Sequence, residues 1–238
     1  FGTGNYHPFS GCGDHRDVLS SPARRLGADV ADMFNFLTGY GRPTRYREVL
    51  MAPNFMLDGI VERVHRVIAA HEAGERARIR MKMNALVHPR VIEALYAAST
   101  AGVPVELNVR GICCLVPGIP GVSENIRVVS ILGRFLEHSR IYTFEYGAET
   151  DVLIGSADLM PRNLDNRVEL IAPVKDPACR DELLDTIDRC MADNTHSWDL
   201  QRDGTWVRNA PGEGEEPRDV QRELLALTSR RAAEVAAQ

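Results

Sequence analysis

The pattern of apolar and polar positions predicts alternating helices and strands along most of the chain. Some stretches repeat apolar residues every three or four positions, as amphipathic helices do, whereas others show short apolar runs or alternation, as strands do. The predicted helices are 26–37, 57–71, 89–99, 181–191 and 220–237. The predicted strands are 49–52, 77–83, 103–109, 126–129, 141–146, 151–155 and 167–174. This order favours an α/β or α+β domain with a mixed sheet.

Both ends of the chain and one internal segment interrupt this pattern. Residues 1–24 are rich in Gly, Ser and Asp without a clear period, so we predict a loop. Gly39, Gly41 and Pro43 end the first helix and indicate a hinge. Residues 204–217 contain Gly, Pro and Glu, which is typical of a solvated linker ahead of the last, mostly charged helix.

Composition narrows the class of protein. The 238 residues suffice for one large domain or two small ones, and 44% hydrophobic residues argue against general disorder. A formal net charge of -5 argues against a protein that binds duplex nucleic acid. The same net charge is compatible with a polyanionic ligand, because a local basic pocket can lie in an acidic protein.

The sequence also bears on location and redox state. It has no run of about 18 uncharged apolar residues, so we expect no membrane span. The opening FGTGNYHP has no signal-peptide pattern and no initiator Met, so it resembles the middle of a longer protein. Five cysteines without a CxxC pair favour a reducing, cytosolic compartment and argue against a structural zinc site.

Charged and polar side chains stand where two of the predicted strands end. Lys82 and Asn84 end strand 77–83, and Arg110 follows strand 103–109. If these strands are parallel neighbours, the side chains converge on one edge of the sheet. Arginine binds phosphate through its planar fork, and lysine binds it as a point charge. The sequence therefore predicts a phosphate site at this edge.

A third strand, 151–155, ends in small and polar residues. Gly155 leaves room for a ligand, Ser156 offers neutral hydrogen bonds, and Arg162 follows with a positive charge. The alternative interpretation is a capped turn before a short helix. If strand 151–155 points the same way as the other two, its end joins the predicted phosphate site.

His138 is the candidate for proton transfer, since it directly precedes strand 141–146. Histidine exchanges protons near neutral pH and is the commonest general acid or base. The neighbouring cations Arg134 and Arg140 favour the neutral imidazole, whereas the carboxylate of Glu137 favours the protonated form. The alternative interpretation is a packed or surface histidine without a chemical role.

Other residues of the stretch 109–141 leave alternatives open. Arg110 is either a phosphate clamp, with Gly111 letting the backbone turn sharply, or a structural arginine that caps a helix or pairs with Glu124. Arg127 either adds a second positive charge or forms a surface ion pair, and the ion pair is favoured. The loop 117–121 either shapes a pocket or only turns the chain.

Several segments resemble the C-terminal part of the bacterial polyphosphate kinases of the long-chain-forming type. The most specific are KMNALV (82–87), RGICCLVPGIPGVSENIRVVSILGRFLEHSRI (110–141) and IGSADLMPRNLDNRVEL (154–170). The segments GTGNYHP (2–8) and GADVADMFNFLTGYGRP (27–43) also match. The resemblance implies a phospholipase D-like α/β fold with two related C-terminal domains.

That fold implies a division of the chain into three parts. Residues 1–43 correspond to a remnant of the first C-terminal domain, and 44–203 correspond to the second. Residues 204–238 form a linker and a peripheral helix. Within the first part, 9–26 does not resemble the family, which has there a tyrosine that helps to bind ATP. A local frameshift in the coding sequence is our hypothesis for this segment.

The resemblance also implies an activity, the transfer of the γ-phosphate of ATP to polyphosphate through a phosphohistidine, with Mg²⁺. Arg110 and His138 match the family's contacts to the nucleotide phosphates. The arginine would stabilise charge on the equatorial oxygens, and the histidine would donate a proton or hydrogen bond. Lys82, Asn84, Ser156 and Arg162 complete the expected ATP and phosphate contacts, and we expect no metal ligand among the side chains.

The expected partners are ATP or ADP and inorganic polyphosphate, without nucleic acid. The family implies a homo-oligomer in the cytoplasm or at the inner membrane surface. Because the family's phosphorylated histidine lies upstream of GTGNYH, we expect it outside this chain and little synthesis by the chain alone. The alternatives are an inactive fragment that binds ATP and polyphosphate, or a remnant that serves subunit association. A phospholipase or nuclease is disfavoured, because the sequence has no HxKxxxxD motif.

Overall fold

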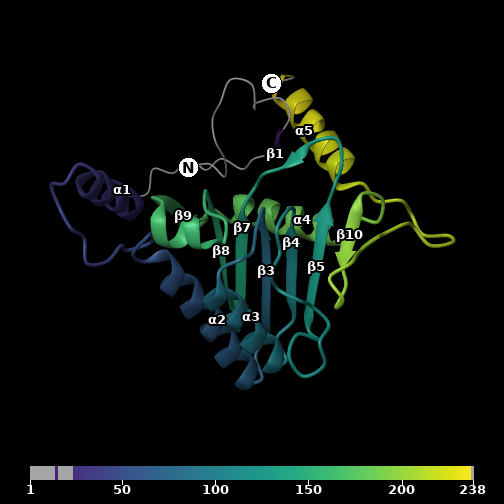
Figure 1. The fold of residues 1–238 in the computed structure, drawn as a ribbon. Coiled ribbons are helices and arrows are strands. Elements are labelled where there is room, and N and C mark those ends of the chain that lie inside the picture. Colours follow the sequence, from purple (N-terminus) through teal and green to yellow (C-terminus); the bar gives the residue numbers. More distant parts are fainter. Residues whose placement is uncertain (1–13, 16–23, 237–238) are drawn as a thin grey trace.

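A nine-stranded mixed sheet forms the centre of the protein in the computed structural model (Figure 1), which describes residues 14–15 and 24–236. The strand order is β11-β10-β5-β4-β3-β7-β8-β9-β2. In chain order the strands are β2 (Leu50–Ala52), β3 (Ala77–Met83), β4 (Val105–Val109), β5 (Ile126–Ile131), β7 (Ile141–Tyr146), β8 (Glu149–Gly155), β9 (Glu169–Pro173), β10 (Ser197–Leu200) and β11 (Trp206–Arg208). The neighbours β3, β4 and β5 are parallel, and the remaining pairs are antiparallel.

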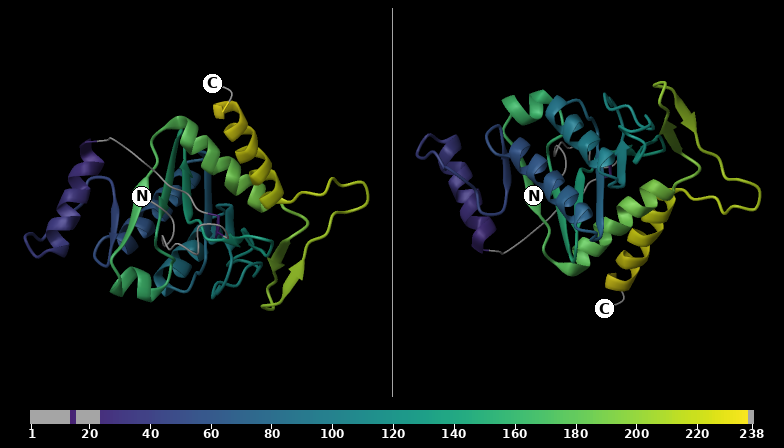
Figure 2. Two further views of the ribbon diagram at one scale, coloured as in Figure 1. Left: turned by 90° about the horizontal axis from the view of Figure 1, so that it is seen from above. Right: turned by 90° about the horizontal axis from the view of Figure 1, so that it is seen from below.

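Helices cover both faces of this sheet. The helices α2 (Met56–Glu72) and α3 (Pro89–Thr100) lie on one face, and α4 (Pro177–Ala192) lies on the other with α5 (Val220–Ala236) outside it (Figure 2). The helix α1 (Arg24–Leu37) lies to one side of this body (Figure 1). No helix within residues 24–236 is long and apolar enough to cross a bilayer.

The apolar cores on the two faces of the sheet follow from the periodicity of the sequence. Along α2 the buried residues Ile60, Val64 and Val67 recur at helical spacing and face the sheet. In β7 the side chains alternate, so Phe144 packs in the core under α2 and α3, whereas Ile141 packs in the core under α4. Because apolar side chains are buried on both of its faces, the sheet forms the centre of the hydrophobic core.

The predicted α/β fold with a mixed sheet is confirmed, and the bounds of β3 and β7 match the predicted strands. The sequence interpretation missed the β10–β11 hairpin, and β11 lies within the segment that we had expected to be a linker. These two strands are short, and each is ordered by a neighbour in the sheet, β10 by β5 and β11 by β10. The domain division at 43/44 and 203/204 stays a prediction, and most of 1–24 lies outside the described residues.

The helix α1 is attached to the body through a buried carboxylate. Asp29 is fully buried and accepts hydrogen bonds from the backbone N–H groups of Arg47, Glu48 and Val49, with N···O distances of 2.7–3.2 Å. Burial by itself raises the pKa of Asp29, but these donors outweigh it and hold the pKa below its usual value. The charged carboxylate therefore ties α1 to the segment that leads into β2.

The variant Asp29→Asn is expected to weaken this attachment by about 1–3 kcal/mol, because hydrogen bonds to a charged group are lost. Hydrogen exchange of residues 24–37 at pH 7 measures the effect, with Asp58→Asn as the control at an exposed ion pair. A group with a lowered folded pKa stabilises above its unfolded pKa and loses that contribution as the pH falls through the folded pKa. The protection factors of residues 24–37 in the wild type, corrected for the pH dependence of intrinsic exchange, should therefore fall in acid. A pH-independent difference in protection between wild type and variant would contradict this account.

Candidate functional site

The predicted site residues lie at one edge of the sheet. The strands β3 and β4 are parallel neighbours, so their carboxyl ends share this edge. The strand β7 runs antiparallel between β3 and β8, and two antiparallel steps give β8 the same direction as β3. The carboxyl end of β8 and the amino end of β7 therefore also lie here, although β8 is not a direct neighbour of β3.

Asp158 is the hub of the polar cluster at this edge. Its Oδ1 atom accepts from the backbone N–H of Asn84 at 2.8 Å and from Nε of Arg140 at 3.2 Å. Its Oδ2 atom accepts from Nη2 of Arg140 at 3.0 Å and from Nδ2 of Asn84 at 3.3 Å. The side chains of Asp158 and Arg140 are both nearly buried. One carboxylate thus joins the end of β3 to the segment that leads into β7.

Arg140 in turn holds His138. Its Nη1 atom donates to the backbone carbonyl of His138 at 3.0 Å and lies 3.4 Å from both ring nitrogens. His138 itself is half-buried. Nearby, the hydroxyl of Tyr142 donates to the carbonyl of Ala157 at 2.6 Å. Burial raises the pKa of Tyr142 well above its usual value, so the hydroxyl stays a donor at neutral pH.

The backbone after β4 is pinned against the end of β3. Arg110 donates its N–H to Met83 at 3.2 Å, and Gly111 donates to the carbonyl of Asn84 at 2.8 Å. A Cβ atom on Gly111 would lie 3.0 Å from that carbonyl, so only glycine fits without a shift. The half-buried Arg110 lines a hollow of about 270 Å³ with Gly111, Ser130, Leu132, Trp198 and Trp206.

Cys113 in the RGICC segment is a half-buried free thiol. Burial raises the pKa of the Cys113 thiol to about 11, against a smaller opposing effect of the backbone at Leu115. A thiol with that pKa is protonated at neutral pH, and the thiolate is the reactive form.

Polar side chains that follow β8 form hydrogen bonds with the start of β9 (Glu169–Pro173). The hydroxyl of Ser156 donates to the carboxylate of Glu169, and Nδ2 of Asn163 donates to Glu169 Oε1 at 2.7 Å. The Ser156 hydroxyl also accepts from the backbone N–H of Leu170 at 3.3 Å. Arg162 is exposed on the short π-helical turn η1 (Arg162–Asn166). Ser156 thus joins β8 to β9, and Arg162 faces solvent.

Lys82 is placed differently from the other predicted residues. Its side chain is 1% exposed, and its Nζ atom lies 2.9 Å from Oε2 of the equally buried Glu137. Nζ also donates to Oγ of Ser139 at 2.7 Å. These two partners directly precede and follow His138, so Lys82 contacts the segment that carries the histidine.

The remaining arginine alternatives are decided by the sheet. Arg127 lies near the amino end of β5, where Nη2 is 3.1 Å from Asp199 Oδ1, so the favoured interpretation as a surface ion pair is confirmed. Glu124 precedes β5 at the opposite edge from Arg110, because β4 and β5 are parallel. The alternative pairing of Arg110 with Glu124 is therefore wrong.

Sequence reasoning missed the structural roles of Asp158, Arg140 and Gln221. Asp158 and Arg140 were visible as opposite charges beside two strand ends, and an antiparallel pairing of β7 and β8 would have brought them together. Gln221, from the first turn of α5, donates to Glu137 Oε1 at 2.7 Å. No sequence signal pointed to Gln221, because it is 84 residues from its partner.

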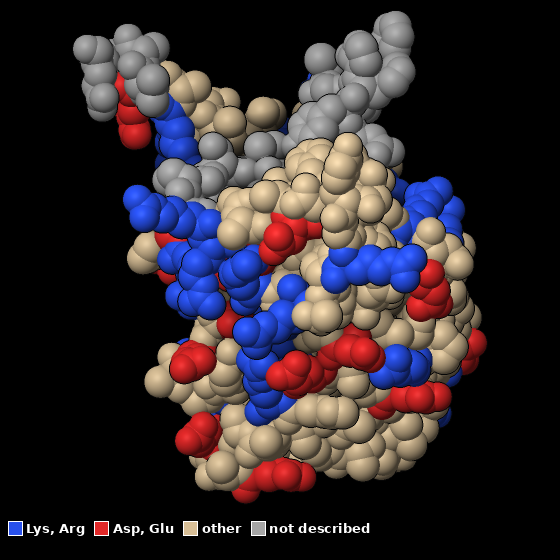
Figure 3. Space-filling model, turned by 90° about the vertical axis from the view of Figure 1, so that its left-hand side faces the viewer, with Lys and Arg blue, Asp and Glu red and all other residues tan. Residues whose placement is uncertain are grey.

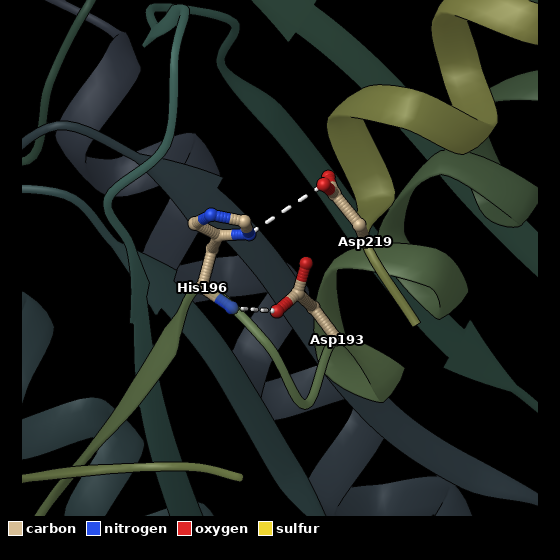
Figure 4. A group of neighbouring side chains, drawn as sticks. All are labelled: Asp193, His196 and Asp219. Atoms are coloured by element: carbon tan, nitrogen blue, oxygen red, sulfur yellow. Dashed lines mark hydrogen bonds and ion pairs between the residues drawn. The ribbon is translucent and has the colours of Figure 1, made fainter. Parts of the chain in front are cut away.

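One group among the described residues has the donor types of a metal site, namely Asp193, His196 and Asp219 (Figure 4). Oδ1 of Asp193 accepts from the N–H groups of Thr195 at 3.0 Å and His196 at 2.7 Å, and Oδ2 accepts from Val220 N–H at 2.9 Å. The carboxylate of Asp193 therefore fixes the start of α5. Mg²⁺ prefers oxygen ligands, whereas one donor of this group is an imidazole nitrogen and both oxygens of Asp193 already accept backbone N–H groups, so we assign no Mg²⁺ to it.

Positive charge also gathers away from the edge cluster. Figure 3 shows Lys and Arg side chains concentrated on the side of the molecule that lies at the left of Figure 1. Between α1 and β2, the exposed Arg42 and Arg45 line a hollow of about 360 Å³ together with Asp32 and Arg47. A protein of net charge -5 thus still presents locally basic surface.

The fold and the edge cluster define a mixed α/β protein whose sheet edge carries arginines and a histidine, the side chains suited to phosphate. Residues 49–221 match the family model of the polyphosphate kinase C-terminal domain 2, and the chain belongs to this family. The confirmed family agrees with the resemblance found in the sequence.

Named relatives and a solved structure support the same family membership. The polyphosphate kinase of Streptomyces coelicolor is 48% identical over 231 residues, which are 97% of this chain and 31% of the relative. The polyphosphate kinase of Mycolicibacterium gilvum is 52% identical over 225 residues, which are 94% of this chain and 30% of the relative. The crystal structure of polyphosphate kinase from Porphyromonas gingivalis superposes with a TM-score of 0.91 at 34% identity, covering 97% of this chain and 35% of that one. The chain thus spans about a third of the length of these relatives, whose name describes a transferase.

Proposed function

We propose that this chain is the C-terminal catalytic region of a polyphosphate kinase, and that it binds the phosphates of ATP and polyphosphate at the sheet edge described above. The observation that carries the proposal is the convergence of Arg110, Arg140 and His138 at that edge in a member of this family. In the whole enzyme the γ-phosphate of ATP passes to polyphosphate through a phosphohistidine. We place that histidine in the part of the relatives that this chain does not span.

The roles that we propose follow from the chemistry of the side chains. Arg110 clamps the transferring phosphoryl group and stabilises charge on its equatorial oxygens. His138 donates a proton or hydrogen bond to the phosphoryl group or its leaving oxygen. Arg140 orients the histidine, and Asp158 holds Arg140 in place. Phosphoryl transfer requires mainly positioning and charge stabilisation, which such a rigid cationic edge supplies.

Asn84, Ser156 and Arg162 remain proposed phosphate contacts at the rim of the site. We propose that Mg²⁺ arrives bound to the nucleotide phosphates, where it neutralises their charge. The nearby carboxylates of Asp158 and Glu169 already accept from arginine or from side-chain donors, so no step is assigned to an ion bound by them. A homo-oligomer in the cytoplasm or at the inner membrane surface is the proposed state of the full-length enzyme.

Titration calorimetry of the chain with tripolyphosphate and with ADP tests the proposal. Arg110→Ala should weaken tripolyphosphate binding by about 10–100-fold, the range expected for charge-assisted hydrogen bonds. Arg127→Ala is the matched control, because its guanidinium lies at the opposite edge in an exposed ion pair. An equal loss in both variants, or wild-type affinity in Arg110→Ala, would contradict the assigned clamp.

A second measurement separates the working enzyme from the alternative, an inactive module that binds ATP and polyphosphate. The isolated chain should form no polyphosphate from ATP, and robust synthesis would refute the placement of the nucleophile elsewhere. A chimera in which residues 27–238 of this chain replace the matching part of the Streptomyces coelicolor relative should synthesise polyphosphate, because the relative then supplies the segment that corresponds to 9–26. Binding by the chain together with an inactive, folded chimera would favour the inactive module.

A further inference from the structure

We infer that Lys82, Glu137 and Gln221 form a buried positioning network that fixes His138, and that the last helix thereby takes part in the site. The inference rests on the proposed role of His138. It assigns a role to α5, whose first turn is where the family match ends, at residue 221.

The first half of the network is an ion pair inside the protein. Lys82 and Glu137 are each 1% exposed and lie 2.9 Å apart from Nζ to Oε2. Lys82 also donates to Ser139 at 2.7 Å, so one ammonium group binds the residues on both sides of His138. A side chain so deeply buried and so engaged is suited to holding that segment, and this is the role that we assign to Lys82 in place of phosphate contact.

The second half comes from the first turn of α5. The amide of Gln221 donates through Nε2 to Glu137 Oε1 at 2.7 Å and to the carbonyl of Phe135 at 2.7 Å. Its Oε1 atom accepts from the N–H of Phe135 at 2.8 Å. The amide thus pairs with the backbone as a neighbouring strand would. A Cβ atom on Gly133 would lie 2.5 Å from that Oε1 atom, so the glycine permits the close approach.

The helix α5 is itself fixed to the body, which gives the network a firm support. The backbone N–H of Val220 donates to buried Asp193 at 2.9 Å, and the side chain of Val220 is 1% exposed beside Ile131 and Cys190. In the same turn Glu223 pairs with Arg218 at 2.9 Å. The first turn of α5 is therefore anchored to the end of α4 through Val220, and its next residue, Gln221, contacts the segment that precedes His138.

The consequence concerns the orientation of the imidazole. A side chain that donates to a phosphoryl oxygen must be held within a fraction of an ångström, and its supporting shell supplies that precision. Glu137 needs both partners, because a buried carboxylate that loses a donor favours a rearranged loop. Removal of the Gln221 amide should therefore move His138 without removing any group that touches phosphate.

Two measurements on the full chain test the network. The ¹H–¹³C spectrum of the imidazoles, with the His138 signal assigned from His138→Gln, reports ring orientation in the unliganded protein. Gln221→Ala should shift or broaden the His138 signal and weaken tripolyphosphate binding about tenfold. Gln201→Ala, in the turn between β10 and β11, is the matched control and should change neither.

A second variant guards against loss of folding. Glu137→Gln keeps the size of the side chain while removing its charge, and it should change the His138 signal in the same way. An unchanged His138 signal and unchanged tripolyphosphate affinity in both variants would overturn the network. If the wild-type chain does not bind tripolyphosphate, the proposed function fails, whereas the imidazole spectrum still decides the positioning network.

Discussion

The variant Asp158→Asn is expected to lower the free energy of unfolding by about 3–5 kcal/mol, the range for breaking a buried ion pair. Asp158 accepts two hydrogen bonds from Arg140 and two from Asn84, and both charged side chains are nearly buried. Asparagine would remove the negative charge that Asp158 places against the guanidinium. Its NH₂ group would also meet a donor of Arg140 or of Asn84, which adds repulsion between donors.

Urea unfolding followed by circular dichroism measures this effect as a shift of the midpoint at constant slope. The control is Asp58→Asn, which breaks the ion pair of Asp58 with Arg90, whose side chains are 73% and 55% exposed. Exposed pairs contribute about 0–1 kcal/mol, so the control should be nearly neutral. Equal midpoints for Asp158→Asn and wild type would show that Asp158 does not organise this edge.

The second large effect is expected at Arg80, under the helix α4. Its guanidinium lies 3.0 Å from Glu145 and also contacts Asp188, and the side chains of Arg80 and Glu145 are 4% and 2% exposed. Arg80→Met alone should destabilise the protein by about 3–5 kcal/mol. Among the described residues, the buried Glu145 would then keep only Arg76, whose side chain is 68% exposed.

The double variant Arg80→Met with Glu145→Leu makes this prediction specific. Replacing both members of a buried pair with apolar residues is often neutral, because no charge is left without a partner. The double variant should therefore recover most of the stability lost in Arg80→Met. Arg66→Met, at an exposed helical pair with Glu62, is the control and should cost less than about 1 kcal/mol. A double variant less stable than Arg80→Met would contradict the account.

The sequence predicted the long helices and strands well. They bury at least one face, and that burial is what produces the regular spacing of apolar residues. The bounds of β3 and β7 and the apolar face of α2 could all be derived from spacing alone. The β10–β11 hairpin could not, since β11 has three residues at the edge of the sheet and is ordered by its pairing with β10. Local pattern carries little information about an element whose stability comes from a distant neighbour.

The candidate site shows the same division. That Asn84, Arg110 and Ser156 stand at strand ends was visible from the sequence, and the structure places all three at one sheet edge. That edge assembles because β7 enters the sheet between β3 and β8, an order that no spacing along the chain specifies. The phosphate contacts themselves stay predictions until binding is measured.

By itself, the sequence determined the helices α1 to α5, the strands of the large sheet other than β10 and β11, the mixed α/β class and the membership of the polyphosphate kinase family. Only the tertiary structure decided which charged side chains are buried and which partners they have. Lys82 shows the difference. Like Asn84 and Arg110 it stands near the end of a strand, but its side chain is only 1% exposed and pairs with Glu137. The physical reason is that periodicity fixes which face a residue occupies, whereas strand order and helix docking decide which distant charge neutralises it.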